Sequence, residues 1–141
     1  MFFLYLQFGY EEVVYANESE TINKCFYLVP NSTRGTFKVD CSLAETVSKS
    51  FDYDVIMVAI IFQESGFNPK AVNKNKNKTL DFGIFQLNNR YWEHKDDDIV
   101  NDILQAKKCK KQNGYGCWVA YSSGDYKKYL DEAETLLSYI K

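Results

Sequence analysis

The chain has 141 residues, of which 45% are apolar, 26% are charged and 16% are aromatic. This length and composition are typical of one globular domain, and the formal net charge of -2 excludes binding driven by general attraction to nucleic acid. No stretch approaches the roughly 20 consecutive apolar residues that cross a bilayer, so the sequence predicts a protein without a membrane span. We expect a monomer.

Residues 1–40 show no clear helical pattern. The apolar residues of Phe2–Phe8 and Val13–Ala16 are compatible with an export signal that ends near residue 16. The basic start of such a signal is missing, and Glu11 and Glu12 interrupt it. A hydrophobic N-terminus of the mature protein, or a misplaced start, is therefore the alternative.

Four cysteines, Cys25, Cys41, Cys109 and Cys117, form no CxxC pair and are accompanied by a single histidine, so a zinc site is not expected. Their separations of 16 and 8 residues suit two local disulfides, Cys25–Cys41 and Cys109–Cys117. The first disulfide would bound a loop over 25–41. This pairing predicts a secreted, periplasmic or otherwise extracytoplasmic location, whereas four buried thiols are the alternative.

Helical patterns begin after Cys41. Apolar residues at helical spacing predict a helix over Ser42–Phe51, and Asp54 is placed to cap a second helix over Val55–Phe62. The second helix is so apolar that we expect it to be buried. Its end falls at the polar sequence Glu64-Ser65-Gly66.

The second half of the chain predicts one hairpin followed by three helices. Weak alternation over Thr79–Leu87, after an Asn/Lys-rich turn, predicts the hairpin. Helices are expected over 99–112, 118–121 and 126–140. The fold class is therefore α+β, mainly helical with one small β-hairpin.

Glu64 stands at the end of the apolar helix, where burial would remove water from its carboxylate and raise its pKa. A protonated glutamic acid can donate a proton to the leaving oxygen of a glycosidic bond. Asp81 follows 17 residues later, between Asn75 and Asn88, whose amides can hydrogen-bond and orient its carboxylate. Two carboxylates in contrasting environments suit an acid and a base or nucleophile, whereas a merely helix-capping glutamate is the alternative.

The residues around this pair resemble the animal (c-type) lysozymes. The similarity runs without a gap from Phe62 to Trp92, and Trp118–Tyr121 resembles the stretch whose tryptophan packs on the catalytic glutamate of that family. The resemblance covers roughly residues 41–124. It implies a lysozyme-like catalytic domain over 41–141 and leaves the N-terminal segment 1–40 unexplained.

The resemblance implies hydrolysis of the β-1,4 bond between N-acetylmuramic acid and N-acetylglucosamine in a peptidoglycan strand, with no cofactor required. Glu64 would be the general acid, and Asp81 the nucleophile or electrostatic stabiliser. The side chains implied to bind the substrate are Gln86, Asn88, Tyr91, Trp92 and Trp118.

Two other activities stay open. Glu64–Ala71 and Ala120–Gly124 also resemble bacterial lytic transglycosylases, which share the lysozyme fold and cleave the same bond to a 1,6-anhydro product. Asp81 favours hydrolysis over this reaction. A non-enzymatic binding module with a lysozyme fold is the second alternative.

The sequence departs from the animal lysozymes just before the acidic run Asp96–Asp98, and the run itself suggests an ion site. Only Glu93–Lys95 separates Trp92 from the run, where the animal enzymes carry a longer loop with a disulfide. The run resembles the calcium loop of α-lactalbumin and calcium-binding lysozymes, with Asp96, Asn101 and Asp102 at side-chain ligand positions. Calcium would be a structural ion there, and a solvated acidic run that caps the next helix is the alternative.

Overall fold

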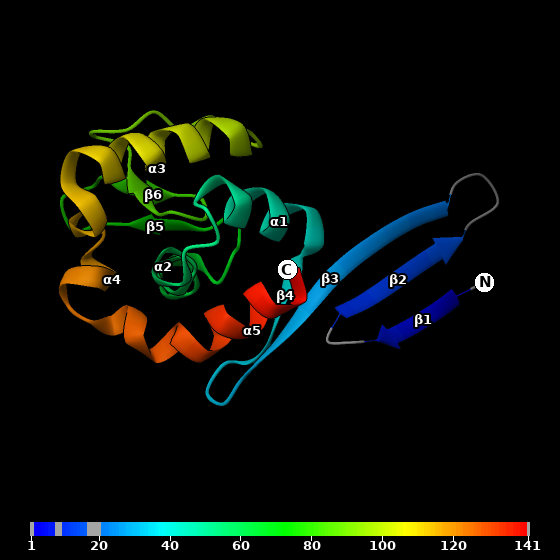
Figure 1. Ribbon diagram of the computed structural model, residues 1–141. Coiled ribbons are helices and arrows are strands. Elements are labelled where there is room, and N and C mark those ends of the chain that lie inside the picture. The colour runs from blue at the N-terminus through cyan, green and yellow to red at the C-terminus, as the bar shows by residue number, and fades with distance from the viewer. Residues whose placement is uncertain (1, 8–9, 17–20, 141) are drawn as a thin grey trace.

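The computed structural model describes residues 2–7, 10–16 and 21–140 of the chain. Its centre is helix α2 (Val55–Ser65), and the other helices are arranged around it (Figure 1). They are α1 (Cys41–Ser50), α3 (Ile99–Asn113), the 3-10 helix η1 (Gly114–Cys117), α4 (Val119–Ser122), the 3-10 helix η2 (Asp125–Tyr129) and α5 (Leu130–Ile140). No helix of the described residues is both long and apolar enough to cross a membrane.

Two antiparallel sheets complete the fold. The first is the meander β1 (Phe2–Gln7), β2 (Tyr10–Ala16), β3 (Thr21–Asn31) and β4 (Gly35–Asp40), and the second consists of β5 (Val72–Lys74), β6 (Leu80–Phe82) and β7 (Leu87–Asn88). Strands β1 and β2 extend away from the helices, whereas β3 and β4 lie beside α1 and α5 (Figure 1). The predicted α+β class is confirmed, but two sheets stand where a single hairpin was expected.

Helix α2 forms the core because its sequence is apolar on every side. The Asp54 carboxylate caps it by accepting hydrogen bonds from the backbone N–H groups of Ile56 and Met57, as the sequence predicted. Each residue from Met57 to Phe62 is buried. The helix ends at Gly66, whose φ of 60° lies in the left-handed region that favours glycine.

The segment expected to be a cysteine-bounded loop is instead the hairpin of β3 and β4. Its turn is built by Asn31, whose side-chain oxygen accepts hydrogen bonds from the backbone N–H groups of Thr33 and Arg34, and by Gly35, with φ at 76°. Val29 and Val39 are fully buried in the same core as the helices. The loop prediction was wrong because it overlooked this local turn chemistry.

Aromatic contacts and a helix cap join the β3–β4 hairpin to the helices. Phe37 lies with its ring centroid 5.0 Å from that of Phe62 and 6.1 Å from that of Tyr129. Asp40, the last residue of β4, caps α1 by accepting a hydrogen bond from the Leu43 N–H at 2.9 Å. The boundary proposed after residue 40 therefore falls at the junction of β4 and α1, and both sides of it share one core.

Both predicted disulfides, Cys25–Cys41 and Cys109–Cys117, are formed, and the alternative of four thiols is wrong. The first joins β3 to the start of α1, and the second joins α3 to η1. Strands β1 and β2 occupy most of the expected signal segment, of which residues 1, 8 and 9 lie outside the described part. Export of the chain stays a prediction.

Replacing Cys25 and Cys41 together by serine should lower the free energy of unfolding by about 3 kcal/mol, because the bond restricts the unfolded chain over the residues it encloses. Replacing Cys109 and Cys117, which enclose a shorter loop, should cost somewhat less. Urea denaturation of both double variants measures the two losses. An unchanged midpoint for the first variant would contradict the expected anchoring of the hairpin.

Candidate active site

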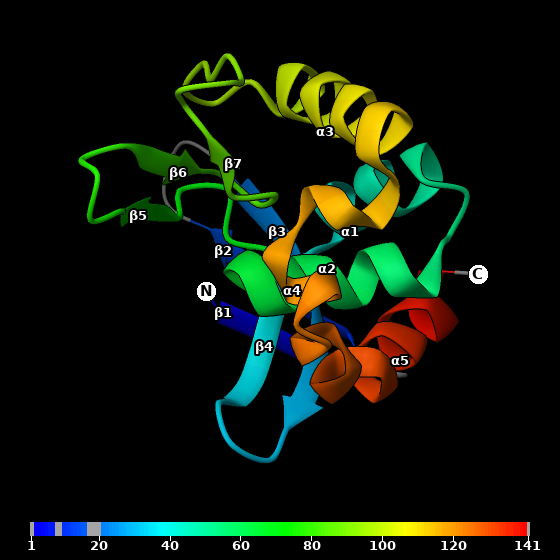
Figure 2. The same ribbon diagram turned by 90° about the vertical axis from the view of Figure 1, so that its left-hand side faces the viewer.

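Glu64 is the penultimate residue of α2 and lies at the end of the buried helix, where it is only partly exposed. Figure 2 shows this end of α2 between the small sheet and α4. Burial raises the pKa of the Glu64 carboxyl from 4.5 to about 7. A hydrogen bond from the backbone of Ala120 in α4 opposes this rise, and the charge of Asp81 adds to it. The structure thus supplies a carboxyl group that is protonated close to neutral pH.

Asp81 lies on strand β6, near enough to Glu64 for its charge to raise the pKa of that carboxyl. It pairs in register with Asn88 of β7, whose side-chain amide donates a hydrogen bond of 2.8 Å to the Asp81 carboxylate and one of 2.8 Å to Thr79 Oγ1. The amide therefore fixes the orientation of the carboxylate. Asn75, expected to share this role, instead donates to Thr79 Oγ1 at 3.1 Å.

A direct hydrogen bond connects the two elements that carry the carboxylates. The Ser65 hydroxyl, next to Glu64, donates to the carbonyl oxygen of Ile84 at 2.7 Å. Ile84 follows the β6 strand and is fully buried. This hydrogen bond holds the C-terminal end of α2 against the segment that follows Asp81 in sequence.

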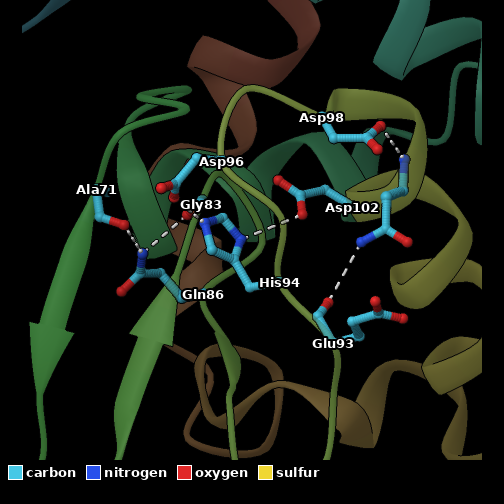
Figure 3. Close-up of polar contacts among 9 residues, drawn as sticks. Ala71, Gly83, Gln86, Glu93, His94, Asp96, Asp98 and Asp102 are labelled. Carbon is cyan, nitrogen blue, oxygen red and sulfur yellow. Dashed lines mark hydrogen bonds and ion pairs between the residues drawn. The ribbon is translucent and has the colours of Figure 1, made fainter.

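Gln86 and Trp118 support the site from inside the protein. The Gln86 amide donates to the carbonyl oxygens of Ala71 and Gly83 at 3.1 and 2.8 Å (Figure 3). Its oxygen accepts a hydrogen bond from the Asn73 amide at 2.6 Å. The Trp118 indole N–H donates to the Phe85 carbonyl oxygen at 2.9 Å, and the side chain is 2% exposed. Substrate contact was expected of both residues; both are buried in this structure, and their substrate-binding role stays a prediction.

Tyr91 and Trp92 lie on one wall of a groove of about 620 Å³. Tyr91 is 71% exposed, and Trp92 is half-buried. Aromatic rings in such positions can pack against the apolar faces of sugar rings. The geometry is therefore compatible with the substrate-binding role expected of these two residues.

The opposite wall of the groove was not anticipated from the sequence. It comes from α3 and from η1, and its lining includes Gln105, Gln112 and Asn113 beside the Cys109–Cys117 disulfide. Amides can hydrogen-bond sugar hydroxyl and acetamido groups. The predicted disulfide was the available signal, because both of its cysteines line the groove.

The residues expected to bind calcium are engaged with other groups (Figure 3). The two ring nitrogens of His94 lie 3.1 Å from an Asp96 oxygen and 3.5 Å from an Asp102 oxygen. The Asn101 amide donates to the Glu93 carbonyl oxygen at 3.4 Å. Within the described part of the chain, no three His, Cys, Asp or Glu side chains are grouped as metal ligands. The residues present do not fit a calcium site.

His94 instead joins the acidic run to the small sheet. Its ring stacks on Phe82 of β6, with centroids 4.4 Å apart and planes inclined by 11°. Burial raises the pKa of the Asp102 carboxyl, and His94 opposes that rise. A side chain at Gly83 would place its Cβ 2.8 Å from an Asp102 oxygen, so glycine is required for this close approach.

Comparison with known proteins finds one family for this site. A model of the C-type lysozyme/alpha-lactalbumin family matches residues 37–96. Lysozyme c-1 of Anopheles gambiae is 36% identical over 81 residues, which are 47% of this chain and 58% of that protein. The milk isozyme of lysozyme C from Canis lupus familiaris is 37% identical over 90 residues, which are 48% of this chain and 70% of that protein.

A solved structure agrees with these matches. The crystal structure of a lysozyme from Litopenaeus vannamei superimposes with a TM-score of 0.51 at 30% identity. The superposition covers 66% of this chain and 93% of the other. The chain spans less than two thirds of the length of the Anopheles protein.

Glu64→Gln should stabilise the protein at high pH. An ionised Glu64 is disfavoured in the fold, so the wild-type protein loses stability as the pH rises from 4.5 to about 7. The variant should therefore gain up to about 3 kcal/mol over the wild-type protein at about pH 8 and almost nothing at about pH 4. Denaturant unfolding at both pH values measures this gain, with the exposed Glu93→Gln as the control. An equal effect at both values would contradict the burial of Glu64.

Calcium should not stabilise the protein. The side chains of Asp96, Asn101 and Asp102 are already bound to protein groups, so the ion would have to displace them. Thermal unfolding in millimolar calcium and in chelator should give the same Tm. A Tm that rises and saturates with calcium concentration would restore the calcium hypothesis.

Proposed function

This chain belongs to the C-type lysozyme/alpha-lactalbumin family, and we propose that it is a glycoside hydrolase acting on peptidoglycan. The bond cleaved would be the β-1,4 bond between N-acetylmuramic acid and N-acetylglucosamine. The observation that carries the proposal is Glu64, whose pKa of about 7 is raised first by burial and further by the charge of Asp81. Lysozyme is the standard example of such a pair of carboxyl groups.

Glu64 would act as the general acid. Its proton passes to the glycosidic oxygen as the bond to the anomeric carbon breaks, and the leaving sugar departs as an alcohol. The carboxylate so formed then accepts a proton from the attacking water. Because the backbone of Ala120 hydrogen-bonds this carboxyl group, α4 would orient it through both steps.

Asp81 would act as the nucleophile or the electrostatic stabiliser at the anomeric carbon. Its carboxylate would form the glycosyl intermediate or balance the positive charge that develops there, and water would complete a reaction that retains the anomeric configuration. The hydrogen bond from Asn88 supports this role, because it directs the carboxylate. A residue that only filled the hairpin would have no need of this orientation.

The groove beside Tyr91 and Trp92 would hold the glycan strand. Its two aromatic rings and three amides offer both the apolar and the polar contacts that sugars require. The Asn88 amide is already hydrogen-bonded to Asp81, so Asn88 would act on the bound glycan by orienting Asp81. The substrate-binding role is thus proposed for Tyr91 and Trp92.

The compartment follows from the disulfides. Two disulfides are stable in an oxidising environment, so we propose that the chain works outside the cytoplasm, where peptidoglycan is accessible. The reaction as proposed uses only side chains of this protein and water, and it requires no cofactor.

Digestion of purified peptidoglycan, followed by mass analysis of the products, tests the proposal. Glu64→Gln should reduce the rate on the order of 10²- to 10⁴-fold, because the variant has no proton to donate. Asp81→Asn should also reduce it severely, and the products should carry reducing ends. The matched Glu93→Gln should retain full activity, since its side chain is exposed.

Other product patterns would contradict hydrolysis. Products with 1,6-anhydro ends, together with a mild loss in Asp81→Asn, would make the protein a lytic transglycosylase. A wild-type protein that binds the glycan without cleaving it would be a non-enzymatic module of the same family.

A further inference from the structure

The groove lined by Tyr91 and Trp92 differs in charge from the chain as a whole. The whole chain has more acidic than basic residues, with 19 of the former and 17 of the latter. Among the described residues that line this groove, however, there is no carboxylate, and one side chain is charged, that of Lys108 in α3. Lys108 therefore shares the lining of this groove with two aromatic residues and three neutral amide residues.

Lys108 differs from Lys107 and Lys110 of the same helix in having no internal partner among the described residues. Lys107 lies over the ring of Phe51 at 6.0 Å from the centroid, and Lys110 contacts the carboxylate of Asp54 at 3.3 Å. Lys108 is exposed, and it takes part in none of the ion pairs found between residues 24 and 140. Its charge is thus available to a ligand in the groove.

A second cation, Arg90, lies beside the aromatic wall of the groove. The Arg90 guanidinium stacks over the exposed ring of Tyr91, 5.7 Å from its centroid. Two positive groups beside a groove with no carboxylate in its lining attract an anionic ligand and give a neutral ligand no electrostatic advantage. Rings, amides and an ammonium group together match a sugar that carries a carboxylate.

We propose that Lys108 makes the groove selective for glycan that bears a carboxylate over neutral glycan of the same length. This inference rests on the proposed function, since it takes the groove to be the glycan-binding surface of the hydrolase. The shared chemistry has two sources in peptidoglycan, the lactyl group of an unsubstituted muramic acid and the carboxylates of an attached peptide. Chitin oligosaccharides carry neither.

The expected size of the effect follows from the openness of the groove. An ammonium and a carboxylate that meet at an exposed surface attract each other weakly, and salt screens the attraction. Loss of the charge should therefore weaken binding of the anionic glycan roughly fivefold. The effect should shrink as the salt concentration rises.

Binding measured in a Glu64→Gln background tests the proposal without cleavage of the ligand. Three ligands of matched sugar number are compared by calorimetry: a peptide-free tetrasaccharide of alternating N-acetylglucosamine and N-acetylmuramic acid, the same tetrasaccharide with its peptides, and chitotetraose. Adding Lys108→Gln should weaken binding of the first, the second or both, and should leave chitotetraose unchanged. Which of the first two responds identifies the carboxylate.

Lys107→Gln is the matched control, because it removes the same charge one residue away and does not line the groove. It should leave all three affinities unchanged. Equal weakening of all three ligands by Lys108→Gln, or no weakening of either anionic one, would overturn the selectivity while leaving the proposed function intact. Failure of every glycan to bind the Glu64→Gln protein would overturn the proposed function as well.

Discussion

The burial of one carboxyl group at the end of an apolar helix is the constraint on which this site depends. Helix α2 is surrounded by other elements, and every residue from Met57 to Phe62 is buried. Glu64 comes two residues after this buried run, so it is taken out of water by the same packing that forms the core. An ionised Glu64 is destabilising there, which ties the stability of the fold to the protonation that catalysis would use.

The β3–β4 hairpin contributes to that packing from the side of α2 away from the small sheet of β5, β6 and β7. Phe37 of β4 lies against Phe62, and it would meet a Cβ at Gly66 at 3.0 Å. The residues that end α2 are therefore enclosed by β4 on one side and joined to Ile84 by Ser65 on the other. Phe37 is also the first residue that the family model matches, so the end of the segment left unexplained by the sequence resemblance helps to hold the end of α2 in place.

The small sheet and α3 are held together without a metal ligand cluster among the described residues. His94 stacks on Phe82 and contacts Asp102, and Asp102 packs against Gly83. These contacts bring the start of α3 to the strand that carries Asp81. They also set the position of the groove wall on α3, because the helix runs without a break from Asp102 to Lys108.

Local sequence determined the α+β class, the Asp54 cap, the burial of α2 and the pairing of the cysteines, because each depends on residues that are near one another in the chain. The same is true of the choice of Glu64 and Asp81, whose residue types and spacing suggested the chemistry. Only the tertiary structure decided that Gln86 and Trp118 are buried, that His94 engages Asp96 and Asp102, and that Lys108 lines the same groove as Trp92. The burial and the charged neighbours of such single polar or aromatic residues are set by segments far apart in sequence, and no local pattern specifies which of them will meet.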